Sequence, residues 1–206
     1  MEAPKLILAS ASPRRQALLK EAGYEFVVHA ADVDEGNVPA GLLPSELAKH
    51  LSNIKADAVG SKFPDAVVLG ADTVVAFGDT VLGKPKNPAD AKRMLELLSG
   101  TTHVVITGVT VVCVGRGFAR STRAMSAVRM KTLSAKEIEK YVASHEWEGK
   151  AGGYGIQDPD PFVTRVSGSH SNIVGLPMKP VKEILGAAGV APGRRNSNDE
   201  TRNSNQ

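Results

Sequence analysis

Cysteine, long apolar runs and aromatic residues are all scarce in this sequence of 206 residues. The single cysteine, Cys113, excludes a disulfide within the chain, and its apolar surroundings, VVCV, predict a buried thiol in a reducing compartment. No apolar run approaches the roughly 20 residues that a membrane-spanning helix needs. The first residues, MEAPKLILASASPRR, also lack the basic segment and hydrophobic core of a secretion signal. We therefore expect a soluble, cytoplasmic protein without a membrane partner.

Aromatic residues make up 4% of the chain, although the formal net charge is +3. The basic residues are spread among acidic ones, and the stacking platforms of a single-strand nucleic-acid binder are missing. This composition argues against polymeric nucleic acid as a partner. The five histidines lie far apart without the spacing of metal ligands, so no zinc site is expected.

An apolar content of 42% is enough for a substantial core in a chain of this length. We assign residues 1–190 to one folded domain. The segment 191–206, APGRRNSNDETRNSNQ, is polar and has no periodic apolar residues, so we expect a disordered tail.

Segments with the patterns of strands and helices alternate along the domain. Runs rich in β-branched residues predict strands at 5–9, 67–77, 80–82, 102–114, 118–130 and 162–166. Capping residues and apolar residues at helical spacing predict helices that start after Ser12, Asn87 and Ser134, and others at 44–59 and 177–188. This alternation indicates an α/β fold with a mixed sheet flanked by helices.

Two arginines stand where a helix would normally carry acidic residues. A helix N-terminus has partial positive charge, yet Arg14 and Arg15 occupy the first turn after Ser12 and Pro13 in the segment SASPRR. Cations are unfavourable there unless an anion shares the site. Together with the hydroxyls of Ser10 and Ser12, the arginines predict a phosphate or carboxylate pocket; the alternative is a solvated helix start.

Asp72 lies inside the apolar strand VVLGADTVVAF. A carboxylate in such a strand must be paired, bound to metal or placed at the strand exit, because burying a bare charge is costly. Asp72 could bind a divalent cation or act as a general base on water, or it could be a structural residue bonded to a turn. Thr73 should point to the opposite face of the strand unless the strand bends or bulges.

The segment GDTVLGKP, residues 78–85, matches the spacing of a phosphate-binding P-loop except at its last residue. Pro85 offers neither the hydroxyl that ligates Mg²⁺ nor a backbone N–H. Because Gly78 falls in the predicted hairpin turn and Lys84 follows the next strand, the match crosses two elements. Lys84 remains a candidate phosphate ligand, although most such lysines are solvated surface residues.

Three further candidates depend on their surroundings. One of Asp32, Asp34 and Glu35, in the acidic run AADVDEG, could join Asp72 in holding Mg²⁺, although an exposed acidic loop is an alternative for each of them. Lys55, on the predicted helix 44–59, is a candidate phosphate ligand when read together with the arginines, or a solvated surface lysine. Gln157 ends the loop segment GYGIQ, and its amide could read the edge of a nucleobase or face solvent.

Taken together, the motifs resemble those of the Maf family of nucleoside triphosphate pyrophosphatases, once described as septum-formation inhibitors. The motifs are SASPRR, VDE, Lys55, GADT, GKP, KAGGYGIQ and NIVGLP, in this order, and the resemblance spans residues 6–190. It implies a fold like that of the inosine triphosphate pyrophosphatases, with two lobes around a cleft, and commonly a homodimer.

The resemblance also implies hydrolysis of a nucleoside triphosphate to the monophosphate and pyrophosphate with a divalent cation, Mg²⁺ or Mn²⁺. Asp72 would be the catalytic proton acceptor, and Glu35 would assist it or the metal. The implied substrate-binding residues are Ser10, Arg14, Arg15, Lys55, Thr73, Lys84 and Gln157, of which Arg14, Thr73 and Gln157 mark substrate specificity. SPRR with Thr73 resembles the branch that hydrolyses dTTP, UTP and modified pyrimidine nucleotides.

Two alternatives remain at this point. One is the 7-methyl-GTP branch of the same family, which typically has Gln in place of Thr73. The other is a nucleotide-sensing regulator of cell division that binds without turnover, against which Asp72, Lys55 and Lys84 argue. One departure concerns Asp158 and Asp160, which stand where family members usually carry a glycine-rich segment. These carboxylates would repel a triphosphate or recruit another metal.

Overall fold

The structure is a computed structural model that describes residues 4–193. Residues 194–206, which hold most of the predicted tail, lie outside the described residues. No helix in the described part of the chain has the length and apolar character needed to cross a membrane.

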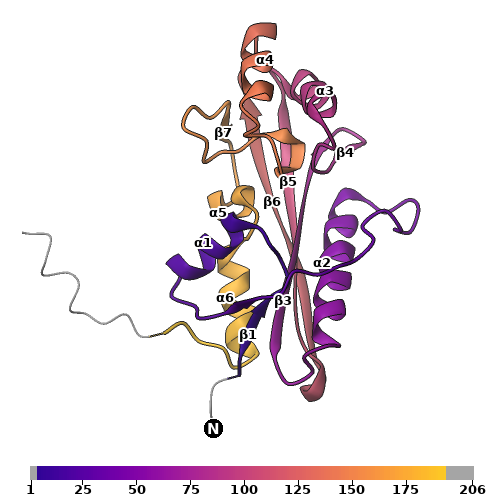
Figure 1. The fold of residues 1–206 in the computed structure, drawn as a ribbon, viewed down its shortest axis with the longest axis vertical. Coiled ribbons are helices and arrows are strands. Elements are labelled where there is room, and N and C mark those ends of the chain that lie inside the picture. Colours follow the sequence, from indigo (N-terminus) through magenta and orange to yellow (C-terminus); the bar gives the residue numbers. More distant parts are fainter. Residues whose placement is uncertain (1–3, 194–206) are drawn as a thin grey trace, which may run out of the picture.

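One mixed sheet of seven strands runs through the whole molecule (Figure 1). Its order is β2-β1-β3-β5-β6-β7, with β4 paired to β3. The strands are β1 (Leu6–Leu8), β2 (Val27–Val28), β3 (Val67–Phe77), β4 (Thr80–Leu82), β5 (Thr102–Cys113), β6 (Phe118–Met130) and β7 (Val163–Arg165). β1 is parallel to β2 and β3, and all other pairs are antiparallel. The predicted α/β fold with a mixed sheet is therefore confirmed.

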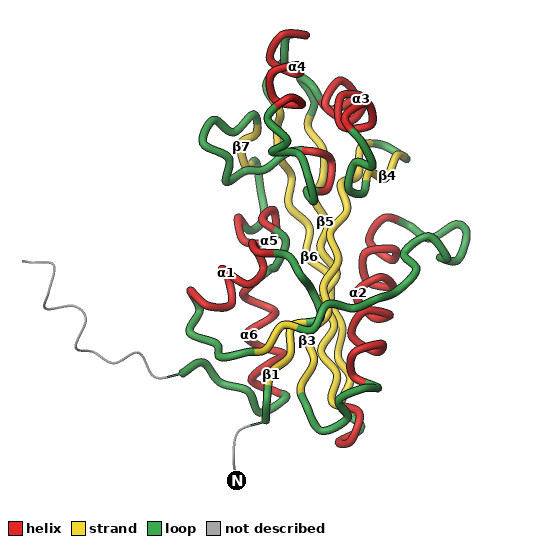
Figure 2. Tube along the Cα trace, in the orientation of Figure 1, coloured by secondary structure: helices red, strands yellow, loops and turns green. Residues whose placement is uncertain are grey.

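Helices cover the sheet on both sides and at one end, as Figure 2 shows. They are α1 (Pro13–Glu21), α2 (Pro44–Gly60), α3 (Pro88–Leu98), α4 (Ala135–Ala143), α5 (His170–Val174) and α6 (Met178–Ala187), with short 3-10 turns η1 (Val114–Arg116) and η2 (Ala151–Gly153). α2 lies on one side of the sheet, and α1, α5 and α6 lie on the other, while α3 and α4 gather at the far end of the long strands. We call the part with β1, β2, α1, α2 and α6 the first lobe, and the part with β4, β7, α3, α4 and η2 the second lobe.

Each lobe has its own apolar core, and the long strands contribute to both. In the first lobe Leu19 of α1 and Leu185 of α6 pack with Val109 of β5. In the second lobe Leu95 of α3 packs with Val105 of the same strand. Because β3, β5 and β6 pass through both cores, the two lobes are held in a fixed relation.

α2 packs unusually close to the sheet because two strand positions are glycine. A Cβ added at Gly70 would lie 2.5 Å from the carbonyl oxygen of Ser52, and one at Gly108 would lie 2.1 Å from that of Ala48. Such distances are sterically forbidden, so a side chain at either position would push the helix away. This close approach brings Lys55 of α2 to the strand residue Asp72.

Several local predictions are confirmed and others are wrong. Ser134 and Glu137 form the expected capping box, and Asn87 caps α3 through the amide of Asp90. Ser12 stands at the N-cap of α1, but its side chain makes no capping hydrogen bond, so the assigned capping role is wrong. β2 and α5 were not expected, since two and five residues are too few to give a periodic pattern.

Candidate active site

The candidate site lies at a gap in the pairing of β3. One edge of β3 pairs with β5 without interruption from Val68 to Ala76. Its other edge pairs with β1 only up to Leu69 and with β4 only from Val75 onward. Among the described strands none pairs with this edge between those points, and Asp72 lies in the gap.

The gap explains how neighbouring strand residues reach one cavity. The register of β3 continues without a bulge, so Asp72 contacts α2 on one face of the sheet while Thr73 contacts α1 on the other. The predicted alternation is confirmed. Both residues nevertheless line the same cavity of ≈ 400 Å³, because an unpaired strand edge is open on both of its faces.

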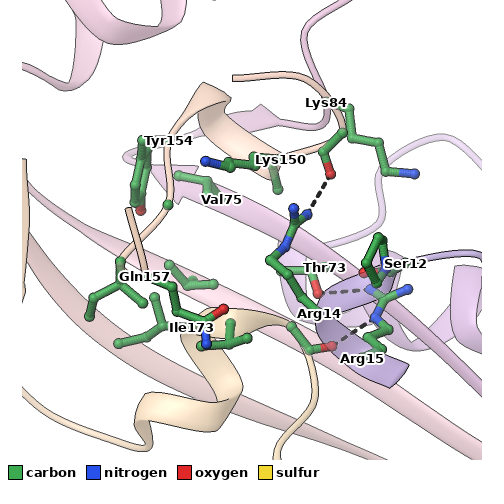
Figure 3. A pocket seen from close by; sticks show the side chains of 18 of the residues that line it. Ser12, Arg14, Arg15, Thr73, Val75, Lys84, Lys150, Tyr154, Gln157 and Ile173 are labelled. Atoms are coloured by element: carbon green, nitrogen blue, oxygen red, sulfur yellow. Dashed lines mark hydrogen bonds between the residues drawn. The ribbon is translucent and has the colours of Figure 1, made fainter. Parts of the chain in front are cut away.

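The cavity has an apolar end and a cationic end. Figure 3 shows Tyr154, Gln157 and Ile173 on one side of Arg14, and Lys84, Ser12 and Arg15 on the other. The lining further includes Val75, Val105 and Ile156 among apolar residues, and Ser10 and Lys150 among polar ones. Such a cavity suits a ligand with a flat, weakly polar part joined to a strongly anionic part.

Arg15 is buried and holds three parts of the site together. Its guanidinium donates to the carbonyl oxygen of Gly175 at 2.8 Å, to Oγ of Ser10 at 3.0 Å and to Oγ1 of Thr73 at 3.0 Å. Thr73 in turn bonds to Thr107 at 3.0 Å. These partners are all neutral. The Thr73 hydroxyl is therefore oriented by the protein before any ligand arrives.

The neutral partners leave Arg14 and Arg15 without a direct counter-charge. Burial lowers the pKa of Arg15, an effect that the more distant charge of Asp72 opposes. Burial likewise lowers the pKa of Arg14, which donates to the carbonyl oxygen of Gly149 at 2.7 Å. Within residues 4–193 neither arginine forms a salt bridge. An anion entering the cavity would supply the missing counter-charge, which agrees with the anion pocket predicted from SASPRR.

Lys84 lies exposed at the rim of the same cavity. The preceding residue, Gly83, accepts a hydrogen bond at 2.9 Å from the backbone N–H of Gly152 in η2. The strand β4 and the turn η2 thus fix the backbone beside Lys84. The lysine reaches the site from the exit of a strand, as the hairpin interpretation of GDTVLGKP requires.

Asp72, Lys55 and Glu35 form one cluster. Nζ of Lys55 lies 2.5 Å from Oδ1 of Asp72 and 2.9 Å from Oε1 of Glu35. Asp72 and Lys55 are both buried, whereas 47% of the Glu35 side chain is exposed. Partial burial would raise the pKa of Glu35, but the hydrogen bond and charge of Lys55 outweigh it and lower that pKa. Glu35 is therefore anionic at neutral pH.

The cluster differs in one respect from the sequence-based assignment. Lys55 was a candidate phosphate ligand, but in the structure its ammonium is held between two carboxylates, and neither Lys55 nor Glu35 lines the cavity. Asp72, which Lys55 contacts directly, is the member of the cluster that lines the cavity. The sequence could not show this pairing, since 17 residues separate Lys55 from Asp72 along the chain.

The donor set at this cluster fits a hard divalent cation that is shared with a phosphate ligand. No group of three or more His, Cys, Asp or Glu side chains able to hold a metal occurs among residues 4–193. Mg²⁺, however, is usually held by one or two carboxylates together with substrate phosphates and water. Asp72 and Glu35 supply two carboxylates, which both contact the ammonium of Lys55. Carboxylate oxygens are donors that Mg²⁺ and Mn²⁺ prefer.

The loop after η2 shows that one expectation about charge is wrong. Asp158 does not stand free beside the ligand space, because its carboxylate accepts hydrogen bonds from Lys150, from Oη of Tyr141 at 2.7 Å and from the Gly155 amide at 3.0 Å. An ion pair of this kind neither repels a phosphate strongly nor offers free oxygens to a metal. Asp160 is exposed and does not line the cavity.

The structure adds residues to which the sequence analysis gave no role. Lys150 and Tyr154 line the cavity, and both belong to the segment KAGGYGIQ. Ile173 and Gly175 belong to NIVGLP and come from α5 and the residue after it. Their places in the motifs KAGGYGIQ and NIVGLP were the one sequence signal that could have pointed to these residues. The apolar residues that line a cavity have no local sequence pattern of their own.

Comparison with known proteins finds relatives along most of the chain. Residues 5–188 match the family model described as Maf-like protein. The chain is 46% identical over 187 residues to a protein of Moorella thermoacetica named dTTP/UTP pyrophosphatase, covering 90% of this chain and 96% of the relative. Relatives with the same name in Vibrio cholerae and Rhodospirillum rubrum are 46% and 45% identical, covering 90% and 92% of this chain and 98% and 90% of their own lengths.

Proposed function

The chain belongs to the Maf family, and from that premise we propose that it hydrolyses dTTP, UTP and modified pyrimidine nucleotides to the monophosphate and pyrophosphate. The observation that carries this proposal is the division of one cavity into an apolar end and a cationic end, with Asp72 in its lining. A base and sugar suit the first end, and a triphosphate suits the second.

Each chemical role has a candidate residue. Arg14, Arg15, Ser10 and Lys84 would bind the phosphates through charge-assisted hydrogen bonds. Lys55 would act through the carboxylates that it holds. At the other end of the cavity, the amide of Gln157 would form hydrogen bonds with the edge of the base. Thr73 and Arg14 would fix the position of the first phosphate relative to the base.

Asp72 would accept the proton of the attacking water. The water oxygen forms a bond to the α-phosphorus, and the bond from that phosphorus to the bridging oxygen breaks, so that pyrophosphate leaves with the electron pair. The proton passes to the carboxylate of Asp72, whose Oδ1 is fixed by Lys55 at 2.5 Å. Arginines at the site stabilise the charge that develops on the phosphoryl oxygens.

Asp72 and Glu35 would hold a divalent cation, Mg²⁺ or Mn²⁺. When bound, such an ion would neutralise charge on the phosphates and orient them. Lys55 lies between the same two carboxylates and keeps them together before the substrate binds. We also expect a homodimer, which light scattering of the purified protein would test.

A panel of nucleoside triphosphates assayed for pyrophosphate and for phosphate release tests the function. We expect pyrophosphate from dTTP and UTP with Mg²⁺ or Mn²⁺, and none after chelation. Preferred cleavage of 7-methyl-GTP would favour the other branch of the family. Tight dTTP binding without any product would favour a nucleotide-sensing regulator.

The variant Asp72→Asn tests the assigned proton acceptor. Because the amide cannot accept the proton, kcat should fall by about 100-fold or more, while dTTP binding is largely kept. Asp79→Asn, in the hairpin turn between β3 and β4, is a matched control that should stay active. Full activity of Asp72→Asn would overturn the mechanism.

A further inference from the structure

The turn that brings Ile156 and Gln157 to the cavity is closed by a carboxylate. Oδ2 of Asp158 accepts the backbone N–H of Gly155, three residues earlier, at 3.0 Å. Ile156 and Gln157 lie between these two residues, and both line the apolar end of the cavity. Short turns closed by an Asp side chain have few accessible backbone conformations. The carboxylate therefore limits where Gln157 can lie.

The same carboxylate ties the turn to two other parts of the second lobe. Oδ2 also accepts the hydroxyl of Tyr141 in α4 at 2.7 Å, and Oδ1 pairs with the ammonium of Lys150. The side chains of Asp158 and Lys150 are only 10% and 13% exposed. A nearly buried carboxylate that accepts hydrogen bonds from three donors is costly to disturb. Asp158 therefore ties the turn to Tyr141 in α4 and to Lys150.

The glycine at position 155 leaves room for the carboxylate. A Cβ added at Gly155 would lie 2.4 Å from Oδ1 of Asp158 and 3.0 Å from Nζ of Lys150. No L side chain fits at this position without moving the ion pair. The absence of a Cβ at Gly155 thus allows the carboxylate to lie directly against the backbone of the turn.

We propose that Asp158 is a positioning residue for base selection, which holds Ile156 and Gln157 against the base. It also neutralises the ammonium of Lys150, so that Lys150 does not bind the phosphates in place of the arginines and Lys84. The proposal rests on the proposed function, because it assumes that a base occupies this end of the cavity. It assigns Asp158 no contact with the reacting atoms.

The proposal predicts opposite effects on two ligands. Loss of the Asp158 side chain releases the turn, so a nucleotide loses contacts at its base. The same change frees the ammonium of Lys150 within the cavity lining, so an anion without a base loses nothing and gains a cation. A merely structural role would weaken both ligands together.

The test compares binding of the α,β-methylene analogue of dTTP, in which the scissile bond is replaced, with binding of inorganic tripolyphosphate. In Asp158→Ala, calorimetry should show the nucleotide analogue bound about ten-fold more weakly, the size expected when an anchored turn with charged hydrogen bonds is released. Tripolyphosphate should bind as tightly as before or more tightly. Selectivity for dTTP over CTP, measured as a ratio of kcat/KM, should fall in parallel.

Two further variants separate positioning from folding. Tyr141→Phe removes one hydroxyl and keeps the ring contact with Phe162, so it should weaken binding of the nucleotide analogue by a smaller factor. Because Lys150 stays paired with Asp158, binding of tripolyphosphate should not change. Asp160→Ala removes an equal charge two residues away, on an exposed side chain for which the described residues show no hydrogen bond or ion pair, and it should leave both affinities unchanged.

The proposal is overturned if Asp158→Ala leaves both affinities unchanged, or if it weakens the nucleotide analogue and tripolyphosphate equally. It is also overturned if Asp160→Ala reproduces the effect of Asp158→Ala. A wild-type protein that releases no pyrophosphate from any triphosphate would defeat the proposed function, and the two binding measurements would still decide the role of Asp158.

Discussion

At the scale of single residues, the molecule contains two kinds of buried polar side chain. Arg15, Lys55 and Asp72 belong to the candidate site: Arg15 and Asp72 line the cavity, and Lys55 holds the carboxylate of Asp72. His103 is different. It is 2% exposed, bonds to the hydroxyl of Tyr154 at 2.6 Å, and has no carboxylate beside it among the described residues. Its role is to fix the ring of Tyr154, which lines the cavity.

His103 predicts a dependence of stability on pH. Burial lowers the pKa of His103 from 6.5 to about 4, so the unfolded chain binds a proton in this interval and the folded chain does not. The free energy of unfolding should therefore fall as the pH drops below 6.5, by about 2 kcal/mol at pH 5 from this residue. Urea unfolding of wild type and of His103→Gln, which cannot titrate, measures it. Equal pH slopes for the two proteins would contradict the assignment.

At the scale of elements, the hairpin β3–β4 supplies the cavity with one cation at its exit. Gly78 forms the turn with φ +55°, and a Cβ there would meet no atom within 4 Å. Lys84 follows β4 and lines the cavity, with its backbone fixed through Gly83 and η2. Gly78 and Lys84 of the apparent P-loop therefore have separate roles. Gly78 shapes the hairpin turn, and Lys84 lines the cavity.

Paired substitutions test this separation. Lys84→Ala should raise the KM for dTTP by about ten-fold, because one charged hydrogen bond to a phosphate is lost, and should leave the melting temperature nearly unchanged. Gly78→Ala should cost about 1 kcal/mol of stability through its positive φ and leave KM unchanged. If the two variants exchanged these effects, the P-loop interpretation of GDTVLGKP would have to be restored.

At the scale of the whole molecule, three strands make one unit of two lobes. β3, β5 and β6 have 11, 12 and 13 residues and contribute to the packing of both lobes. The cavity is lined by α1 from the first lobe and by η2 and its following loop from the second. Arg14 already joins these sides through the carbonyl oxygen of Gly149. Ligand binding should consequently stabilise both lobes together.

Calorimetric unfolding tests this coupling. Wild type should unfold in a single transition, and the α,β-methylene analogue of dTTP at about 100 times its Kd should add about 2.7 kcal/mol of stability. For a domain of this size the melting temperature should rise by roughly 5–10 °C. Two separate transitions, with only one shifted by the ligand, would show that the lobes unfold independently.

The amino-acid sequence alone predicts the fold class, the approximate bounds of the long strands and of most helices, and the chemistry of several candidate site residues. Alternation of β-branched runs with capped apolar helices is local, so it predicted the strands β3, β5 and β6 and the helices α2, α3 and α4 closely. Asp72, inside an apolar strand, and Arg14 and Arg15, at a helix start, can also be found from the local sequence. A buried carboxylate is poorly solvated, and cations at a helix N-terminus are electrostatically unfavourable.

Which side chains come together is visible only in the folded chain. Arg15 bonds to Gly175 across 160 residues, Lys55 pairs with Asp72 across 17, and the gap in the pairing of β3 opens Asp72 and Thr73 to one cavity. Asp158 changed from a suspected source of repulsion to a bonded anchor for the same reason. Whether a charge is free or neutralised depends on neighbours that packing brings together, and no local pattern in the chain specifies them.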